Sequence, residues 1–243
     1  MTPLLRLLRH PRTSRFAALG LLGYFVGEWI VSASWRGAFT YRWARSGELG
    51  IPYCGRGDIP CSAIWPVMDA GMIITGVAII VIAASWRALN WAPNAATAAL
   101  IAGGIGLIGA AVITERVDYQ WHVIALDVFF VFTTAGCLLV GVSNTTWLPG
   151  SGRTVLTVAG TLATVGYFAL TGGLTGWLGP GGTERVVIYS LLAGLLIAGL
   201  RGAKRIDARP AGQGVADDAP TETFEPIAAG DPARPALVEE TVH

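Results

Sequence analysis

The stretch AIWPVMDAGMIITGVAIIVIAA at residues 63–84 decides the class of fold. Asp69 is its only charged side chain, and the rest is apolar or small. A bilayer core about 30 Å thick is crossed by about 20 helical residues. Backbone polar groups in lipid must be satisfied within the segment, and a helix does this. The stretch therefore predicts a transmembrane helix.

Apolar stretches of similar length lie on both sides of this one, separated by turns rich in Gly and Pro or by charged turns. The sequence predicts an all-α, polytopic membrane bundle of six transmembrane helices with both termini in the cytoplasm. The expected spans are 16–34, 63–84, 96–114, 121–142, 153–176 and 185–201.

Composition supports a multi-pass protein of the cell membrane. The chain is 53% hydrophobic and 14% charged, with a mean hydropathy of +0.55, whereas soluble domains carry about 25% charge. The net charge of +1 gives no reason to expect nucleic acid as a partner. Membrane lipids are the expected partners, and a protein partner would dock on Gly-rich helix faces or on the acidic tail.

The ends of the chain differ from the apolar region between them. Residues 1–15 are basic, and Arg and Lys are more frequent at the ends of the spans that we place inside, which favours cytoplasmic termini. Residues 16–203 form the expected membrane domain. Residues 204–243 are rich in Pro, Ala, Asp, Glu and Thr, which predicts a disordered cytoplasmic tail.

Cys54 and Cys61 lie in the loop after the first span, which this orientation places outside the cytoplasm. Disulfides persist there, and the glycines and proline of the loop allow it to turn back. We expect a disulfide between them, with two free thiols as the alternative. Cys137, in the middle of a span, is expected to be a small buried hydrophobe.

The acidic side chains of the spans are the strongest indication of a site. Threading the spans through a bilayer sends Glu28, Asp69, Glu115, Asp118, Asp127 and Glu184 to the same side. Ionisable groups in the membrane cost at least a few kcal/mol, so they require a partner, water or a task. The alternatives are solvated residues at span ends and structural hydrogen bonds between helices.

Spacing suggests local groups within this set. Glu115, Asp118 and His122 share a face if their turn is helical, and Arg185 and Tyr189 align in the last span. The predicted ligand-binding residues are Glu28, Asp69, Glu115, His122, Asp127, Glu184, Arg185 and Tyr189. Two glycine groups are expected to be packing notches between helices: Gly20, Gly23 and Gly27, and Gly172, Gly173 and Gly176.

The chain lacks the motifs of common membrane enzymes and transporters. There is no Walker loop, zinc-binding H-E-x-x-H helix, G-x-S-x-G elbow or dinucleotide fingerprint. We expect no cofactor and no metal site, and no catalytic residue is assigned.

The chain resembles bacterial membrane proteins grouped under the domain of unknown function nine hundred and ninety-eight, over nearly all of residues 16–203. The resemblance is carried by Phe25-Val-Gly-Glu28, the Cys54 and Cys61 loop with Ser62-Ala-Ile-Trp-Pro-Val-Met-Asp69, Glu115 with His122, and Gly182-Thr-Glu-Arg-Val-Val-Ile-Tyr189. Asp69, where that pattern more often carries Asn, and Arg42-Trp-Ala-Arg-Ser-Gly-Glu48 depart from it. The resemblance implies a six-helix membrane fold and supplies no activity.

Three hypotheses of function follow. The first is a small integral membrane protein with an outward-facing polar pocket for a lipid or other amphiphile. The second is an accessory or structural subunit of a membrane complex. The third is a membrane-embedded enzyme that uses a carboxylic acid as proton donor on a lipid or isoprenoid substrate.

Overall fold

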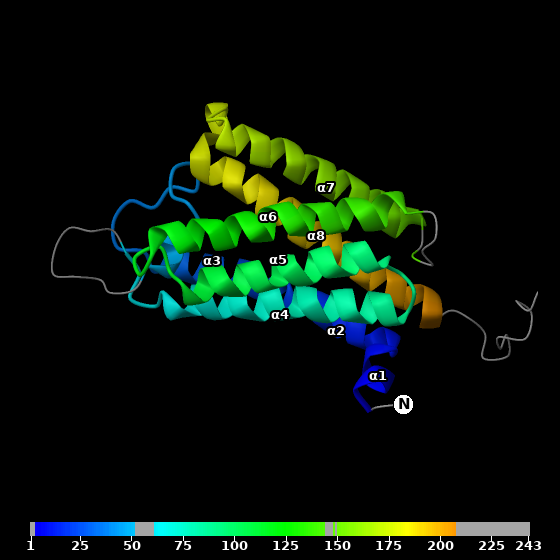
Figure 1. Ribbon diagram of the computed structural model, residues 1–243. Coiled ribbons are helices and arrows are strands. Elements are labelled where there is room, and N and C mark those ends of the chain that lie inside the picture. Colours follow the sequence, from blue (N-terminus) through cyan, green and yellow to red (C-terminus); the bar gives the residue numbers. More distant parts are fainter. Residues whose placement is uncertain (1–2, 52–60, 144–147, 149, 208–243) are drawn as a thin grey trace, which may run out of the picture. The chain divides into compact units, whose positions relative to one another are not determined.

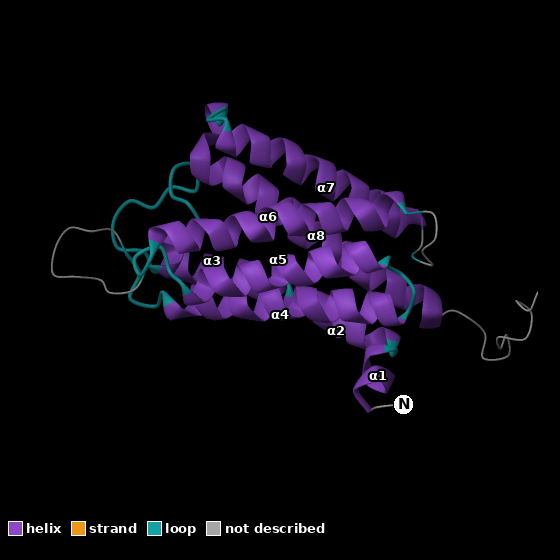
Figure 2. Cartoon of the chain, in the orientation of Figure 1, coloured by secondary structure: helices purple, strands orange, loops and turns teal. Residues whose placement is uncertain are grey.

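The structure is a computed structural model that describes residues 3–51, 61–143, 148 and 150–207. In these residues it contains helices, two short 3-10 turns and no strand (Figure 2). Six helical segments are long and apolar enough to cross a membrane. The predicted all-α, multi-pass bundle is confirmed, while the side of the membrane that holds the termini stays a prediction.

The helices follow one another along the chain, with the longest connection between α3 and α4. Their bounds are α1 (Pro3–Leu8), α2 (Pro11–Gly20), α3 (Leu22–Ala33), η1 (Gly47–Gly50), α4 (Pro66–Ala88), α5 (Asn94–Val112), α6 (Tyr119–Val142), α7 (Gly150–Thr171), η2 (Gly176–Leu178) and α8 (Gly179–Asp207). The first span comprises α2 and α3, which are separated only at Leu21. The last helix begins at Gly179 rather than at residue 185, because Gly179 adopts a positive φ and Pro180 takes the first turn.

The chain divides into two units, Met1–Ala208 and Arg209–His243. The second unit lies outside the described residues, so the disordered tail stays a prediction. The expected disulfide is not supported by the described residues, since Cys54 lies outside them. Cys137 is fully buried in α6, as expected.

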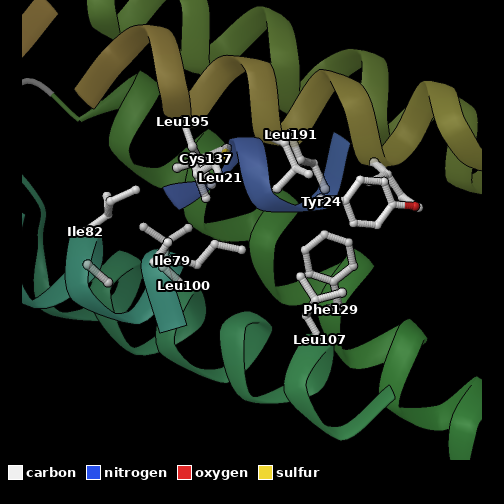
Figure 3. Close-up of a cluster of buried hydrophobic side chains, with 14 of the residues drawn as sticks. Leu21, Tyr24, Ile79, Ile82, Leu100, Leu107, Phe129, Cys137, Leu191 and Leu195 are labelled. Atoms are coloured by element: carbon white, nitrogen blue, oxygen red, sulfur yellow. The ribbon is translucent and has the colours of Figure 1, made fainter. Parts of the chain in front are cut away.

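Neighbouring helices pack against one another, and α4 and α8 each also pack against the first span. α4 contacts α2, α3 and α5, while α8 contacts α2, α6 and α7. Between them lies an apolar core in which Tyr24, Ile79, Leu107, Phe129 and Leu191 point toward one another (Figure 3). The first span therefore joins the α4 side of the bundle to the α8 side.

Glycines allow several of these helices to approach closely. A Cβ on Gly27 would lie 3.0 Å from the Val67 carbonyl oxygen, so α3 rests on the backbone of α4. The packing prediction is confirmed for Gly20, Gly23 and Gly27. It is wrong for Gly173 and Gly176, which have positive φ and open space around them and so serve the turn before α8.

The described residues of the first unit have two distinct ends (Figure 1). We call the end that holds the connection from α3 to η1, the connection from α5 to α6 and the start of α8 the loop end. The terminal end holds α1, the connection from α4 to α5 and the last turns of α8.

Candidate functional site

Glu28 on α3 and Arg185 on α8 form a buried ion pair at the loop end. Arg185 Nε donates to Glu28 Oε1 over 2.6 Å, and the Tyr189 hydroxyl donates to Glu28 Oε2 over 2.5 Å. The side chains of the pair are 5% and 3% exposed. Both carboxylate oxygens thus have a donor, as a buried charge requires. The three residues form a network in which both oxygens of Glu28 have a donor, while Arg185 Nη2 is buried with no hydrogen-bond partner among the described residues.

Arg185 also binds the connection between α3 and η1. Its Nη1 donates to the carbonyl oxygens of Tyr41 at 3.0 Å, Ala44 at 2.6 Å and Gly181 at 3.0 Å. Its guanidinium lies 4.9 Å from the centre of the Tyr41 ring, a cation–π distance. Arg185 therefore fixes this connection over the start of α8.

The start of α8 is shaped to receive that connection. Gly181 and Gly182 donate their backbone N–H groups to the carbonyl oxygen of Arg42, at 3.0 and 3.3 Å. The first N–H groups of a helix have no partner inside it, so a carbonyl from the connection satisfies them. The sequence Gly179-Pro-Gly-Gly182 leaves room for this approach, and it brings Glu184 and Arg185 inward, where both are buried.

The turn from Ser46 through η1 touches three of the predicted acids and His122. Ser46 donates its hydroxyl and its N–H to Glu184 Oε1. A Cβ on Gly47 would lie 2.7 Å from His122 Nε2 and 3.4 Å from Glu115 Oε2. A Cβ on Gly50 would collide with Asp69 Oδ1. The turn therefore packs against these three acidic side chains and against His122.

His122 has a fixed tautomer. Its Nδ1 lies 2.9 Å from the Ala110 carbonyl oxygen and 2.8 Å from that of Ile113. Because both partners only accept, Nδ1 carries the proton. Nε2 is then an acceptor in the neutral ring, and it is buried with no hydrogen-bond partner among the described residues. The residue is 4% exposed.

A cavity of about 280 Å³ opens beside this imidazole, between α6, α7, the start of α8 and the turn before η1. Its walls combine acidic, basic and apolar side chains. They are Arg45, Gly47, Glu115, Tyr119, His122, Val123, Leu126, Asp127, Phe130, Tyr167, Leu170, Thr171 and Glu184.

Asp127 is held in the cavity wall from the neighbouring helix. The Tyr167 hydroxyl on α7 donates to Asp127 Oδ1 over 3.2 Å. A carboxylate accepts several hydrogen bonds, so Asp127 retains capacity for a ligand. α6 and α7 are thus joined by a polar contact at the cavity.

Glu115 lies in the connection between α5 and α6, outside the spans, and is half-buried. Burial raises the pKa of its carboxyl above the ordinary value. Glu48 raises this pKa further, while His122 and Arg45 lower it. Part of the cavity's negative charge therefore depends on pH.

The structure divides the eight predicted ligand-binding residues into three groups. Glu115, His122, Asp127 and Glu184 line the cavity. Glu28, Arg185 and Tyr189 form the ion-pair network, and Asp69 lies apart from the cavity, against Gly50. Asp118 caps α6 by accepting from the Trp121 N–H at 3.1 Å, so it has a structural task.

Sequence reasoning missed Arg45, Ser46, Gly47 and Tyr167. Tyr167 follows Asp127 by 40 residues, and Ser46 precedes Glu184 by 138. No local spacing connects residues so distant in the chain. Among the described residues, no group of three or more His, Cys, Asp or Glu side chains is arranged to hold a metal ion.

One family model matches the chain. It is described as "Protein of unknown function (DUF998)", and it covers residues 65–201, more than half of the chain. The family resemblance read from the sequence is confirmed. The matched range contains the eight predicted residues except Glu28. No curated protein and no solved structure matches the chain.

Proposed function

The chain belongs to the DUF998 family, and we propose that this six-span membrane protein binds the cationic head group of a bilayer-resident amphiphile in its loop-end cavity. The observation that carries the proposal is the buried Nε2 of His122, which has no hydrogen-bond partner in the described part of the chain and belongs to a cavity lined by three carboxyl groups.

The charges around the cavity favour a cation. Glu115, Asp127 and Glu184 line it, and Arg45 and His122 are the basic side chains among its lining residues. Arg185 is close by but is paired with Glu28. A cationic group would offset the excess of negative charge, whereas an anion would add to it.

The hydrogen-bonding groups favour a donor. The carboxylates accept, as does Nε2 of His122 in the neutral ring, while the Tyr167 hydroxyl already donates to Asp127. A primary ammonium carries three donors and no acceptor. It therefore matches this set of acceptors better than a quaternary ammonium, which has no N–H.

The size and the apolar walls favour a head group attached to a lipid chain. Ligand pockets for whole small molecules measure about 300–1,000 Å³, and this cavity holds about 280 Å³. Val123, Leu126, Phe130 and Leu170 provide apolar surface beside the polar groups. The head group would enter the cavity while the chain stays in the bilayer.

The test uses the full chain in nanodiscs of a neutral lipid, titrated with amphiphiles of the same chain length. Dodecylammonium is expected to raise the melting temperature more than dodecyltrimethylammonium, because binding to the folded state alone stabilises it. Dodecyl sulfate is expected to give no specific shift. Asp127→Asn should reduce the ammonium effect, and Asp118→Asn, at the N-cap of the same helix and outside the cavity lining, should keep it. Equal shifts for the ammonium and the sulfate would contradict the proposal.

A further inference from the structure

A second cavity lies at the terminal end, away from the site described above. It has a volume of about 460 Å³ and lies between the end of α1, the end of α4 and the start of α5. Its lining residues are Leu8, Arg9, Ala84, Arg87, Ala88, Asn90, Thr97 and Ile101.

Two hydrogen bonds hold the wall formed by the N-terminal helices. Ser85 on α4 donates its hydroxyl to the Leu8 carbonyl oxygen over 2.9 Å. The fully buried Trp86 donates its indole N–H to Ser14 Oγ on α2, also over 2.9 Å. Since Leu8 and Arg9 are adjacent, these bonds place the Arg9 backbone beside the end of α4, and the cavity is part of the packed structure.

The polar lining is basic and lacks an acid. Arg87 Nη1 donates to Asn90 Oδ1 at 3.3 Å, which leaves its other donors available. In the described part of the chain, neither Arg9 nor Arg87 is paired with a carboxylate. Both arginines are exposed, and two like charges in the lining of one cavity favour an anion as its ligand.

The remaining walls are apolar. Leu8, Ala84, Ala88 and Ile101 provide a hydrophobic surface next to the two arginines. An inorganic anion would use the arginines alone, whereas a lipid would use both parts of the lining. The cavity also lies where α4 ends and α5 begins, at the expected depth of lipid head groups.

We propose that this cavity binds the phosphate of an anionic phospholipid. Guanidinium groups bind phosphate oxygens through paired, charge-assisted hydrogen bonds. Basic pockets between transmembrane helices at the cytoplasmic side are suited to anionic head groups, and the cytoplasm is where the arginine distribution places this end. The proposal concerns a different end of the bundle from the cationic site and does not depend on it.

The experiment is native mass spectrometry of the full chain released from nanodiscs that contain equal amounts of phosphatidylglycerol and phosphatidylcholine. The wild type should retain phosphatidylglycerol preferentially. Arg9→Gln and Arg87→Gln should each reduce that retention severalfold. Arg201→Gln is the matched control, because Arg201 is an exposed arginine of α8 outside the cavity lining; it should retain the lipid like the wild type.

A soluble competitor separates the two sources of phosphate. Millimolar inorganic phosphate should leave phosphatidylglycerol bound to the wild type, because the apolar walls contribute to lipid binding only. Displacement by inorganic phosphate would overturn the assignment to a lipid. The same retention in all four proteins, or equal retention of the two lipids by the wild type, would overturn the site itself.

Discussion

Gly47 in η1 lies against the imidazole of His122 on α6, so close that a Cβ on the glycine would lie 2.7 Å from Nε2. The ring cannot turn away without losing the contacts of its Nδ1 with the Ala110 and Ile113 carbonyl oxygens. The absence of a side chain at residue 47 therefore leaves room for the imidazole in the cavity wall.

We predict that Gly47→Ala weakens dodecylammonium binding roughly tenfold or more. The new methyl group would occupy the space beside Nε2, and a hydrogen bond to a charged group is worth about 1.5–3 kcal/mol, where about 1.4 kcal/mol is tenfold in affinity. Titration in nanodiscs measures the change. Gly109→Ala is the control, because its Cβ would meet Ala125 Cβ at an ordinary 3.4 Å. Equal affinity of both variants would contradict this role of Gly47.

His122→Asn tests the roles of the two ring nitrogens separately. The asparagine amide can donate to the carbonyl oxygens that Nδ1 now contacts, but it has no group at the position of Nε2. We expect a melting temperature close to that of the wild type together with a clear loss of ammonium binding. If the variant binds like the wild type, Nε2 does not contact the ligand.

Glu28→Gln tests the buried ion pair. The substitution leaves the Arg185 guanidinium buried without its counter-charge, and such changes cost about 3–5 kcal/mol. We expect a clearly lower melting temperature in nanodiscs. Glu48→Gln, at a less buried carboxylate that accepts from the Arg45 N–H at 3.0 Å, should change it much less. Similar small shifts for both variants would refute the structural role of the pair.

The raised pKa of Glu115 gives opposite pH dependences to stability and to binding. Burial favours the neutral carboxyl, so Glu115 contributes to stability below its ordinary pKa, and this contribution is lost as pH rises through the raised folded-state pKa. Binding of a cation should instead strengthen over the same range, because it favours the ionised carboxyl.

Melting temperatures measured against pH, with and without dodecylammonium, check both trends. Glu115→Gln should flatten both curves in this range. A wild-type affinity for dodecylammonium that is constant across this pH range, or that falls as pH rises, would show that the charge of Glu115 does not contribute to binding.

The class of fold was predictable because each span is a long apolar stretch, which can be recognised in the sequence without knowledge of tertiary contacts. The gathering of Glu28, Asp69, Glu115 and Glu184 at one end was predictable for the same reason, since span direction alternates. What could not be predicted is which acids pair. The Arg185 contact with Glu28 spans 157 residues of sequence, and the role of Gly47 depends on how the connection between α3 and η1 folds over the helix ends.

The start of α8 shows a second limit of prediction from the sequence. The glycines and Pro180 suggested a break before residue 185, but their backbone instead forms the first turn of the helix and receives the Arg42 carbonyl oxygen. Breaker residues mark a boundary without saying on which side of them the helix begins.

The most direct test of the cationic site is native mass spectrometry of the full chain taken from the membranes of the cell that produced it. The wild type and Asp118→Asn should carry a lipid whose head group has a primary ammonium, and Asp127→Asn should carry much less of it. The same lipids in the same amounts on all three proteins would contradict the account.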